Sequence, residues 1–354
     1  MRKIVPSTRW LVLTASITFL LAGPALAQPS LVSLKTDKAP VIDGTADPAW
    51  ERAPAFKIKL DKTVYEPSNG FKGVTKTTVT LRSMYDKEHV YFLVGYDDPT
   101  QSLARAPWVK QPDGSWKRSA NKDSTGHENT YYEDKFGLIW NINTAGFEKK
   151  GCDAACHKAR GGKNAGIEDT SPGRMYTDKP GETIDMWHWK SVRTNPVGQV
   201  DDQYIDDTKD PKKNANWGRK NDTKTGGGYV DNVNKEKTRP LFMSKTPGAN
   251  GRYWMLASDK TEFVDTFKPG DIVPSMIVEP FIGSRADIET KGAWKDGVWT
   301  IEIKRKLVTT GDKAKEQDIQ FDDLKKPYYF GVAVFDNTQI NHVYHEGVHK
   351  LIFK

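Results

Sequence analysis

Cysteine is scarce in this 354-residue chain, which contains only two, at positions 152 and 156. A chain with a single possible pair is not a small scaffold held together by several disulfides. Long helical periodicity is also scarce, which argues against a helical bundle. Beyond the first 27 residues no apolar run approaches the length of a membrane span, and the mean hydropathy is −0.67. A strand-rich, water-exposed domain is the class that remains.

The first 27 residues have the pattern of a secretory signal. A basic start is followed by an apolar stretch from Trp10 to Ala22 and by Ala25-Leu26-Ala27. An uncleaved N-terminal anchor is the alternative interpretation. Cleavage would leave residues 28–354 and lower the formal net charge from +7 to +4, because three basic residues and no acids are lost. We therefore expect an exported, periplasmic protein without a membrane span.

Both cysteines stand in the segment Cys152-Asp153-Ala154-Ala155-Cys156-His157. A cysteine pair followed directly by histidine is the attachment motif of c-type haem, in which the thiols bind the haem vinyl groups and the histidine binds iron. The usual motif has two residues between the cysteines, and this one has three. On a helical turn, residues four apart still lie about 40° from each other, so both thiols would share one face. A disulfide and a metal site remain as alternatives, although the first does not require His157 and the second needs further ligands.

Alternating or aromatic-rich runs predict strands in much of the chain. The expected strands cover residues 77–81, 90–96, 136–140, 298–303 and 328–335. Short helical turns are expected only at residues 48–52 and around Cys152. This pattern predicts a mainly β fold, an antiparallel β-sandwich with long loop insertions and a few short helices.

No clean linker divides residues 28–354, so we expect one domain, with the haem-attachment segment at about 146–190. An insert at about 206–240 is rich in Lys, Asn, Asp and Gly and is expected to be flexible. Residues 207–239 hold nine Lys or Arg against five Asp or Glu. With only Trp217 and Tyr229 as aromatics, this is not a nucleic-acid-binding profile. It is either a solvated loop or a docking patch for an acidic redox partner.

Several stretches resemble known families. Residues 39–50, which include Ile42-Asp43-Gly44 and Trp50, resemble the opening of family-9 carbohydrate-binding-module sandwiches. Residues 185–190 (Asp-Met-Trp-His-Trp-Lys) and 294–299 (Trp-Lys-Asp-Gly-Val-Trp) resemble the ethylbenzene dehydrogenase gamma-subunit family of haem-binding domains, also described as cytochrome c-552/DMSO reductase-like. The resemblance implies a β-sandwich that encloses one haem and passes electrons.

The gamma subunits hold a non-covalent b-type haem through Met and Lys, whereas the cysteine pair here predicts one covalent haem c with His157 as an axial ligand. By resemblance, Met175 corresponds to the family's methionine and is the expected second iron ligand. His188 is the strongest chemical alternative, and Met186 is its rival. If residues 185–190 form a strand, Met186 and His188 share one face of it, opposite the two tryptophans.

A histidine group near the C-terminus and two pairs of aspartates are not expected to bind the haem iron. His342, His345 and His349 lack a cysteine or carboxylate at metal-ligand spacing and are expected at the surface or in support of other ligands. The pairs Asp201-Asp202 and Asp206-Asp207 are expected to be solvated turn acids, with a cation site as the alternative.

These observations predict a periplasmic mono-haem c-type cytochrome that carries single electrons and is not an enzyme. The expected partners are redox proteins, for instance a molybdenum oxidoreductase or a quinol-oxidising complex. Two alternatives remain. One is a haem enzyme with an open distal site, and the other is a carbohydrate-binding β-sandwich without a redox role.

Overall fold

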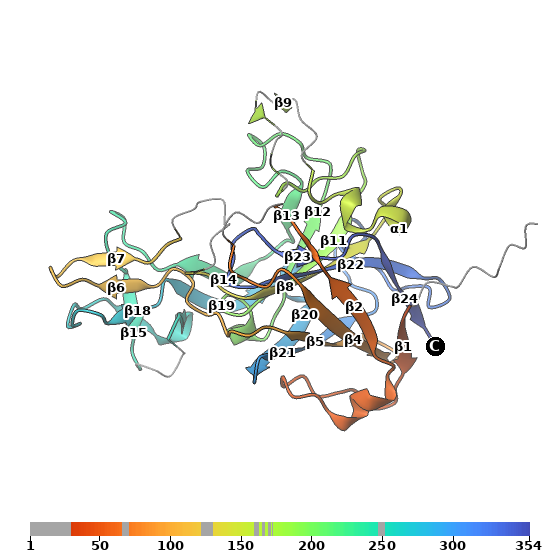
Figure 1. Cartoon of the computed structure of the whole chain (residues 1–354), viewed down its shortest axis with the longest axis horizontal. Coiled ribbons are helices and arrows are strands. Elements are labelled where there is room, and N and C mark those ends of the chain that lie inside the picture. Colours follow the sequence, from red (N-terminus) through yellow and green to blue (C-terminus); the bar gives the residue numbers. More distant parts are fainter. Residues whose placement is uncertain are drawn as a thin grey trace, which may run out of the picture.

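The computed structural model describes residues 30–65, 71–121, 130–158, 163–164, 167–168, 171, 173–246 and 252–354. The expected signal peptide lies outside these residues. Strands dominate the described chain, and its helices are short (Figure 1). None of the helices in this described part has the length and apolar character of a transmembrane segment.

One large sheet forms the body of the molecule. Its strands are β1 (Leu31–Lys35), β2 (Phe56–Leu60), β3 (Lys62–Thr63), β4 (Thr77–Tyr85), β5 (His89–Asp97), β8 (Lys135–Asn141), β11 (Ile184–Lys190), β12 (Asp201–Ile205), β13 (Arg219–Asn221), β20 (Ile288–Lys295), β21 (Val298–Lys306), β22 (Tyr328–Phe335), β23 (Val343–Tyr344) and β24 (His349–Phe353). The order along the sheet is β13-β12-β11-β8-β22-β24-β1-β4-β5-β21-β20, with β2 beside β4 and with β23 between β22 and β3.

Smaller sheets extend from this body. They contain β6 (Trp108–Lys110), β7 (Trp116–Arg118), β9 (Lys163–Asn164), β10 (Ile167–Glu168), β14 (Gly226–Asp231), β15 (Phe242–Ser244), β16 (Trp254–Leu256), β17 (Lys260–Glu262), β18 (Ile272–Val273) and β19 (Met276–Ile282). The helical elements are α1 (Phe147–Lys150), α2 (Ala314–Gln317) and the 3₁₀ turns η1 (Pro48–Arg52), η2 (Cys152–Ala154), η3 (Asn195–Val197), η4 (Ala257–Asp259) and η5 (Ser284–Ala286).

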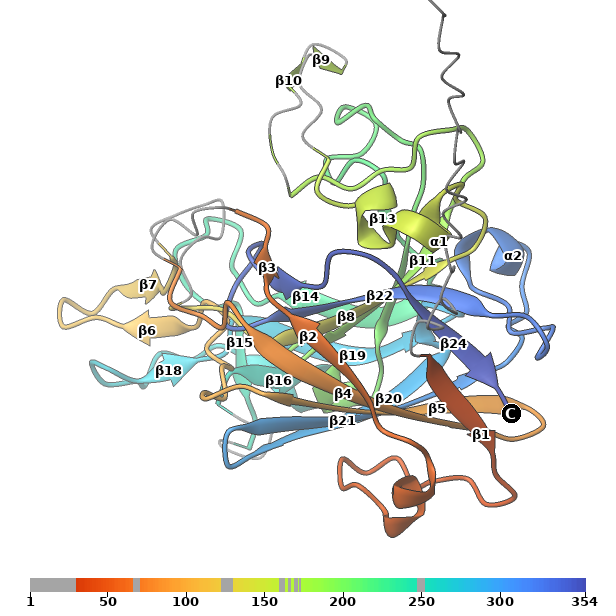
Figure 2. The ribbon, with the colours of Figure 1, turned by 45° about the vertical axis from the view of Figure 1, so that its right-hand side comes forward.

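The long sheet folds over on itself to make two packed layers (Figure 2). Aromatic rings from the two halves of the strand order meet in the core. Phe92 of β5 lies 5.6 Å from Trp140 of β8, and Trp189 of β11 lies 4.9 Å from Trp299 of β21. All four rings are fully buried, and burying such a side chain contributes about 1.5–3 kcal/mol. The sandwich predicted from the sequence is therefore confirmed.

The predicted strands and turns also lie where they were expected. Strand β22 has the predicted bounds, and β4, β5, β8 and β21 contain the other predicted runs. The helical turn at residues 48–52 is η1. The pairing is not purely antiparallel, because β1 pairs in parallel with both β24 and β4, and β16 pairs in parallel with β19 in a smaller sheet. The insert at 206–240 contains β13 and β14, and its flexibility stays a prediction.

The resemblance at residues 39–50 has a physical basis in the packing of η1. Trp50 is buried, and its indole Nε1 donates to the Oε1 of Glu302 on β21 at 2.9 Å. The second oxygen of Glu302 accepts from the backbone N–H groups of Asp43 and Gly44. One buried carboxylate thus fixes both the Asp-Gly turn and the tryptophan of this opening segment.

Candidate haem site

The cysteines lie on a helical turn, as their spacing predicted. The backbone N–H of Cys156 donates to the carbonyl of Cys152 at 2.8 Å, which is the bond that closes an α-helical turn. Both side chains are buried, and the two thiols are hydrogen-bonded to each other. This hydrogen bond, followed by burial, raises the pKa of the Cys152 thiol.

The residue before the first cysteine must be glycine. Gly151 has φ +56°, and it forms a backbone bridge with Gly347 just before β24. A Cβ atom on Gly151 would lie 1.7 Å from the carbonyl oxygen of Gly347, which no relaxation of a side chain could relieve. Gly151 therefore allows the attachment turn to pack directly on the C-terminal segment.

An apolar cluster surrounds the two cysteines. Cys152 and Cys156 are packed with Ile139, Phe147, Ile184, Ile205 and Met186, and Met175 packs against the same cluster. The cysteines themselves do not line the neighbouring cavity. Met175 and Met186 belong to both the cluster and the cavity wall, so the apolar cluster and the cavity are contiguous.

A cavity of about 600 Å³ lies beside this cluster. Small-molecule and cofactor sites occupy roughly 300–1,000 Å³. The cavity wall includes all four residues that the sequence singled out as possible iron ligands, which are His157, Met175, Met186 and His188. These residues come from a loop and a strand separated by as many as 31 positions, so the fold brings them together.

Strand β11 presents its side chains as its alternation predicted. Met186 and His188 line the cavity, whereas Trp187 and Trp189 lie in the core between the two layers. The predicted division of this strand into two faces is confirmed.

His188 has the hydrogen-bonding pattern of a metal-binding histidine. Its ring is 3% exposed, and its Nδ1 lies 3.2 Å from the Oε1 of Gln203 on the adjacent strand. With Nδ1–H donated to Gln203, the lone pair is on Nε2, which is buried and has no partner among the described residues. Burial, followed by the charge of Lys190, lowers the pKa of His188, so the ring is neutral and able to bind a metal.

His157 occupies a strained backbone position at the edge of the same cavity. Its φ is +55°, a conformation that costs about 1–2 kcal/mol in a residue other than glycine. Its ring stacks on Tyr344 with centroids 4.3 Å apart and lies 5.2 Å from the ring of His342. The surrounding contacts hold this strained backbone conformation, which places the imidazole in the cavity wall.

The C-terminal histidines were expected at the surface or in support of other ligands, and burial of His342 leaves only the supporting role for that residue. His342 is 5% exposed and lines the cavity, with its Nδ1 2.7 Å from the carbonyl of Ile340. His345 and His349 are half-buried, and their rings lie 4.5 Å apart. The sequence offered no sign that His342 would turn inward, because its position depends on the contact between the C-terminal segment and the attachment turn.

The cavity wall is strongly basic. Among the described residues that line it, six are basic and none is acidic; the basic ones are Arg105, Lys135, Arg174, Lys190, Arg193 and Arg219. Lys135 is 2% exposed, and no carboxylate lies within ion-pair distance of it in the described chain. Burial, followed by the charge of Arg193, lowers its pKa well below the usual value. An anionic group in the cavity would favour the charged form of Lys135.

Two buried carboxylates behind the wall hold other cations in place. Glu133 pairs with Arg193 and with Arg105, and Asp201 pairs with Lys190 and Arg285. Although burial opposes it, the charge of Arg193 keeps the pKa of Glu133 below its usual range. These ion pairs fix the positions of the basic groups around the cavity.

The prediction that the paired acids are solvated is therefore wrong for Asp201 and Asp202, which lie on β12 and are fully buried. Asp206 and Asp207 are half-buried, and Asp206 pairs with Lys220. Sequence reasoning missed Asp201 because a pair of acids suggests a turn. The only local signal was that apolar residues flank this polar stretch, Val200 before it and Ile205 after it.

The residues present fit a haem. The porphyrin has an apolar vinyl edge and an anionic propionate edge. The cavity wall offers Met175 and Met186, which contact the apolar cluster around the cysteines, together with lysine and arginine side chains. The buried Nε2 of His188 has no partner among the described residues and is free to bind a ligand. The donor set, two imidazoles and two thioethers, is one that iron in a haem accepts.

The fold and the cavity define the class of protein as a β-sandwich with a basic, imidazole-lined cavity. The family described as "Ethylbenzene dehydrogenase" matches residues 47–347, so the chain belongs to the ethylbenzene dehydrogenase family. The resemblance found in the sequence is thereby confirmed.

Two similar solved structures are of a carbohydrate binding module family 9 from Caldicellulosiruptor kristjanssonii. The complex with cellotriose is 11% identical, with 92% of this chain and 94% of that chain covered and a TM-score of 0.34. The complex with glucose is 10% identical, with 91% and 95% covered and the same TM-score. No curated protein matches the chain.

Proposed function

We propose that this protein is a mono-haem c-type cytochrome that carries single electrons between redox partners. The observation that carries the proposal is the shared cavity, whose wall contains both the histidine of the cysteine motif and a second, buried histidine whose Nε2 has no partner among the described residues. When bound, a haem supplies a one-electron Fe(III)/Fe(II) couple. It would be held by thioether bonds to Cys152 and Cys156 and by axial nitrogen from His157.

The chain's own residues have three tasks in this proposal. Gln203 fixes the tautomer and orientation of His188 through its side-chain oxygen. Lys135 and its arginine neighbours supply positive charge for the propionates. The apolar cluster around the cysteines excludes water from the vinyl edge, and low solvent exposure helps to set the redox potential.

For the second axial ligand, the family resemblance favours Met175, and the geometry favours His188. Two side chains would hold the haem iron between them only if they came from different parts of the cavity wall. Met175 and His157 lie on hydrogen-bonded backbone segments of the same wall, since Lys158 donates to the carbonyl of Arg174 and Tyr176 donates to that of Ala155. His188 comes from the sheet instead. We therefore propose His157 and His188 as the axial pair, with Met175 as the alternative.

The cellular location and the electron-transfer partners are inferred from the sequence. We infer that the protein is exported to the periplasm by its N-terminal signal and that its electron partner is a redox protein. Because the chain belongs to the ethylbenzene dehydrogenase family, a molybdenum oxidoreductase is the first candidate, and a quinol-oxidising complex is the second.

Covalent attachment is tested by intact mass and by a pyridine haemochrome spectrum, on protein made in a host competent for cytochrome maturation. We expect the mass of the chain without residues 1–27 plus one haem. Replacing both Cys152 and Cys156 with Ser should remove the covalent haem. A wild-type mass equal to bare polypeptide would end the proposal.

The axial pair is tested with His188→Ala and Met175→Ala, and with His89→Ala as a control outside the cavity. We expect His188→Ala to give a high-spin ferric spectrum, while the other two variants stay low-spin. If Met175→Ala becomes high-spin and loses a sulfur-to-iron absorption band while His188→Ala does not change, Met175 is the ligand that the family resemblance implies.

The two alternative functions predict different behaviour. An enzyme with an open distal site would bind cyanide or carbon monoxide promptly, whereas a carrier with two axial ligands would not respond. A carbohydrate-binding sandwich would be colourless and retained on a polysaccharide column, whereas we expect a red protein that passes through it.

A further inference from the structure

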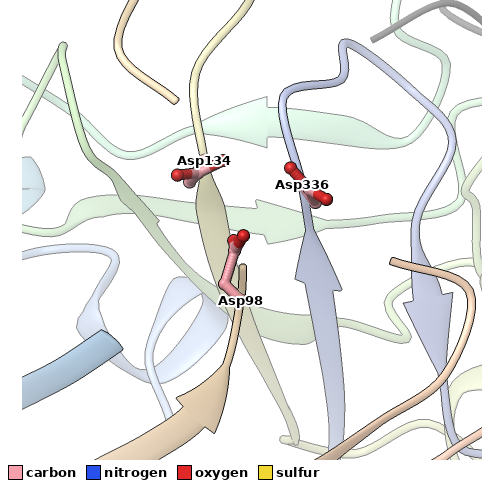
Figure 3. A group of neighbouring side chains, drawn as sticks. All are labelled: Asp98, Asp134 and Asp336. Atoms are coloured by element: carbon pink, nitrogen blue, oxygen red, sulfur yellow. The ribbon is translucent and has the colours of Figure 1, made fainter. Parts of the chain in front are cut away.

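Three buried aspartates meet at one end of the main sheet, outside the cavity described above (Figure 3). Asp98 directly follows β5, Asp134 directly precedes β8, and Asp336 directly follows β22. One carboxylate oxygen of each lies within 4.8 Å of the others. Asp98 and Asp134 are fully buried, and Asp336 is 4% exposed.

Nothing in the described chain neutralises these three charges. No Lys, Arg or His of the described residues forms an ion pair with any of them, in contrast to the carboxylates behind the cavity wall. Burial raises the pKa of all three, and for Asp98 burial together with the neighbouring Asp336 raises it to about 7. Three buried carboxylates without a cation are expensive to ionise together.

The oxygens of this cluster are positioned, and two polar atoms within it lack partners. Asp134 accepts from the backbone N–H groups of Ser102 and Asn337 and from the indole of Trp299. By contrast, Oδ2 of Asp98 is buried and has no hydrogen-bond partner among the described residues. Figure 3 shows the Asp98 carboxylate directed into the space between the other two.

The second atom without a partner is the hydroxyl oxygen of Tyr96, on the same strand as Asp98 and two residues before it. It is also buried and unpartnered among the described residues. Burial, and then the charges of Asp134, Asp98 and Asp336, raise the pKa of Tyr96, which places its hydroxyl in the field of the cluster. An unpaired carboxylate oxygen and an unpaired hydroxyl at one place indicate a missing ligand that binds oxygen.

A second cluster of aspartates in the chain provides a contrast. One oxygen each of Asp185, Asp202 and Asp318 also lies within 4.8 Å of the others. There, the buried guanidinium of Arg305 lies 3.6 Å from Asp185 and 4.0 Å from Asp318. This cluster carries its own cation, and the cluster at Asp98 does not.

We propose that Asp98, Asp134 and Asp336 bind one hard divalent cation of the calcium class. Calcium takes oxygen ligands only, at about 2.3–2.6 Å, so two oxygens on one ion lie at most about 5 Å apart. The spacing of the three carboxylates fits this limit. In this proposal the Tyr96 hydroxyl, which is under the electrostatic influence of all three aspartates, would supply a further oxygen directly or through a water molecule.

The cation would stabilise the part of the cavity wall that lies next to the three aspartates. Asp134 and Asp336 are the chain neighbours of Lys135 and Phe335, which line the cavity. The same carboxylates hold the backbone at Ser102, Val74 and Asn337. The site would therefore join the ends of β5, β8 and β22 into one rigid unit next to the basic wall.

The wild-type chain is tested after removal of metals with EDTA. We expect one Ca²⁺ per chain by calorimetric titration and by elemental analysis, and a melting temperature about 5 °C higher at a hundredfold excess over Kd. Tb³⁺ provides a local readout, because the Trp299 indole is hydrogen-bonded to Asp134 and should sensitise its luminescence. Added Ca²⁺ should quench that signal by displacement.

Two variants locate the site. Asp98→Asn removes one charge from the cluster, so the EDTA-treated variant should melt at or above the wild-type temperature, while its Ca²⁺ affinity falls at least tenfold. Asp318→Asn is the matched control, since it alters a buried carboxylate of the cluster that contains Arg305. It should keep the full response to Ca²⁺.

Absence of any effect of Ca²⁺ on melting, together with absence of Tb³⁺ luminescence in the wild type, would overturn the proposal. The three aspartates would then share protons. A calcium response that persists in Asp98→Asn and disappears in Asp318→Asn would overturn it too, because the ion would belong to the other cluster.

Discussion

Gly151 shows how much of the site depends on a single missing Cβ atom. The residue lies between α1 and the attachment turn, and its backbone bridges Gly347. The contact holds Cys152 against Gly331 of β22, whose own Cβ would lie 3.7 Å from that of Cys152. The orientation of the cysteine motif on the sheet is therefore set by backbone contacts.

Replacing Gly151 with Ala should destabilise the fold by about 3 kcal/mol or more, because the new Cβ meets a backbone carbonyl. Gly146→Ala is the matched control, since Gly146 also has a positive φ, +80°, but nothing lies within 4 Å of its Cβ position. We expect the control to lose only about 1 kcal/mol in denaturant unfolding. Equal losses in the two variants would contradict the steric explanation.

His349 should make stability fall in mild acid. Burial, followed by the charge of His345, lowers its pKa to about 4, whereas a histidine in the unfolded chain titrates near 6.5. The unfolded chain therefore binds a proton that the folded chain refuses. The contribution of neutral His349 to the free energy of unfolding is complete above about pH 6.5. It is lost as pH falls toward 4, by up to about 1.4 kcal/mol per pH unit.

The measurement is the free energy of unfolding of wild type and His349→Phe between pH 8 and pH 4. Phenylalanine keeps a ring against Phe56 and Phe330 and cannot titrate. The wild type should lose stability faster than the variant below pH 6.5. Parallel curves would show that His349 is protonated in the folded state.

At the scale of elements, the hydrogen bond from the Trp50 indole to Glu302 connects the 3₁₀ turn η1 to β21. Trp50→Phe keeps most of the buried ring and removes the donor to Glu302, leaving Oε1 of that buried carboxylate unpaired. We expect a loss of about 1–3 kcal/mol in unfolding free energy. Trp254→Phe serves as a control, because its indole N–H has no partner among the described residues. A cost no larger than that of the control would refute the role of the bond.

The elements themselves were largely predictable from the sequence. Strand β11 is the clearest case, since two-residue alternation assigned Met186 and His188 to one face before any packing was known. A helical turn was expected around Cys152, and the four-residue spacing of the cysteines is compatible with it. Both signals are local, so a single segment contains all the information that they require.

The cavity wall could not be predicted in the same way. Arg105, Lys135, Arg193 and His342 come from four different segments, and each alone has the pattern of an ordinary surface or core residue. What brings them together is the pairing of β8 with β11 and β22, which depends on tertiary packing. The aspartate cluster at Asp98 escaped notice for the same reason, because its members follow or precede three separate strands.

At the scale of the whole molecule, uneven charge should govern the approach of partners. Lys212 and Lys213 are exposed in the insert, next to Ala215 and Trp217 of the cavity wall. If the protein carries electrons as proposed, reversing both lysines to Glu should slow oxidation by ferricyanide severalfold at low salt, because the anion loses its attraction to this face. The effect should vanish at high salt.

Stopped-flow oxidation of the reduced protein measures this, with Lys291→Glu/Lys295→Glu as a control of equal charge change on β20, where both lysines are exposed. The control should change the rate much less. Equal slowing by the two double variants would mean that only net charge matters and that the insert is not a docking patch.

The pairing of β1 with β24 has a consequence for how the polypeptide acquires its shape. Leu31 lies opposite Leu351, so the first and last strands of the described chain are neighbours in the finished sheet. The main sheet cannot be completed until the residues of β24 have left the ribosome. Closing a loop of this size is slow. Such a delay would keep the nascent polypeptide unfolded through most of its synthesis, in a form that could still pass through a narrow channel.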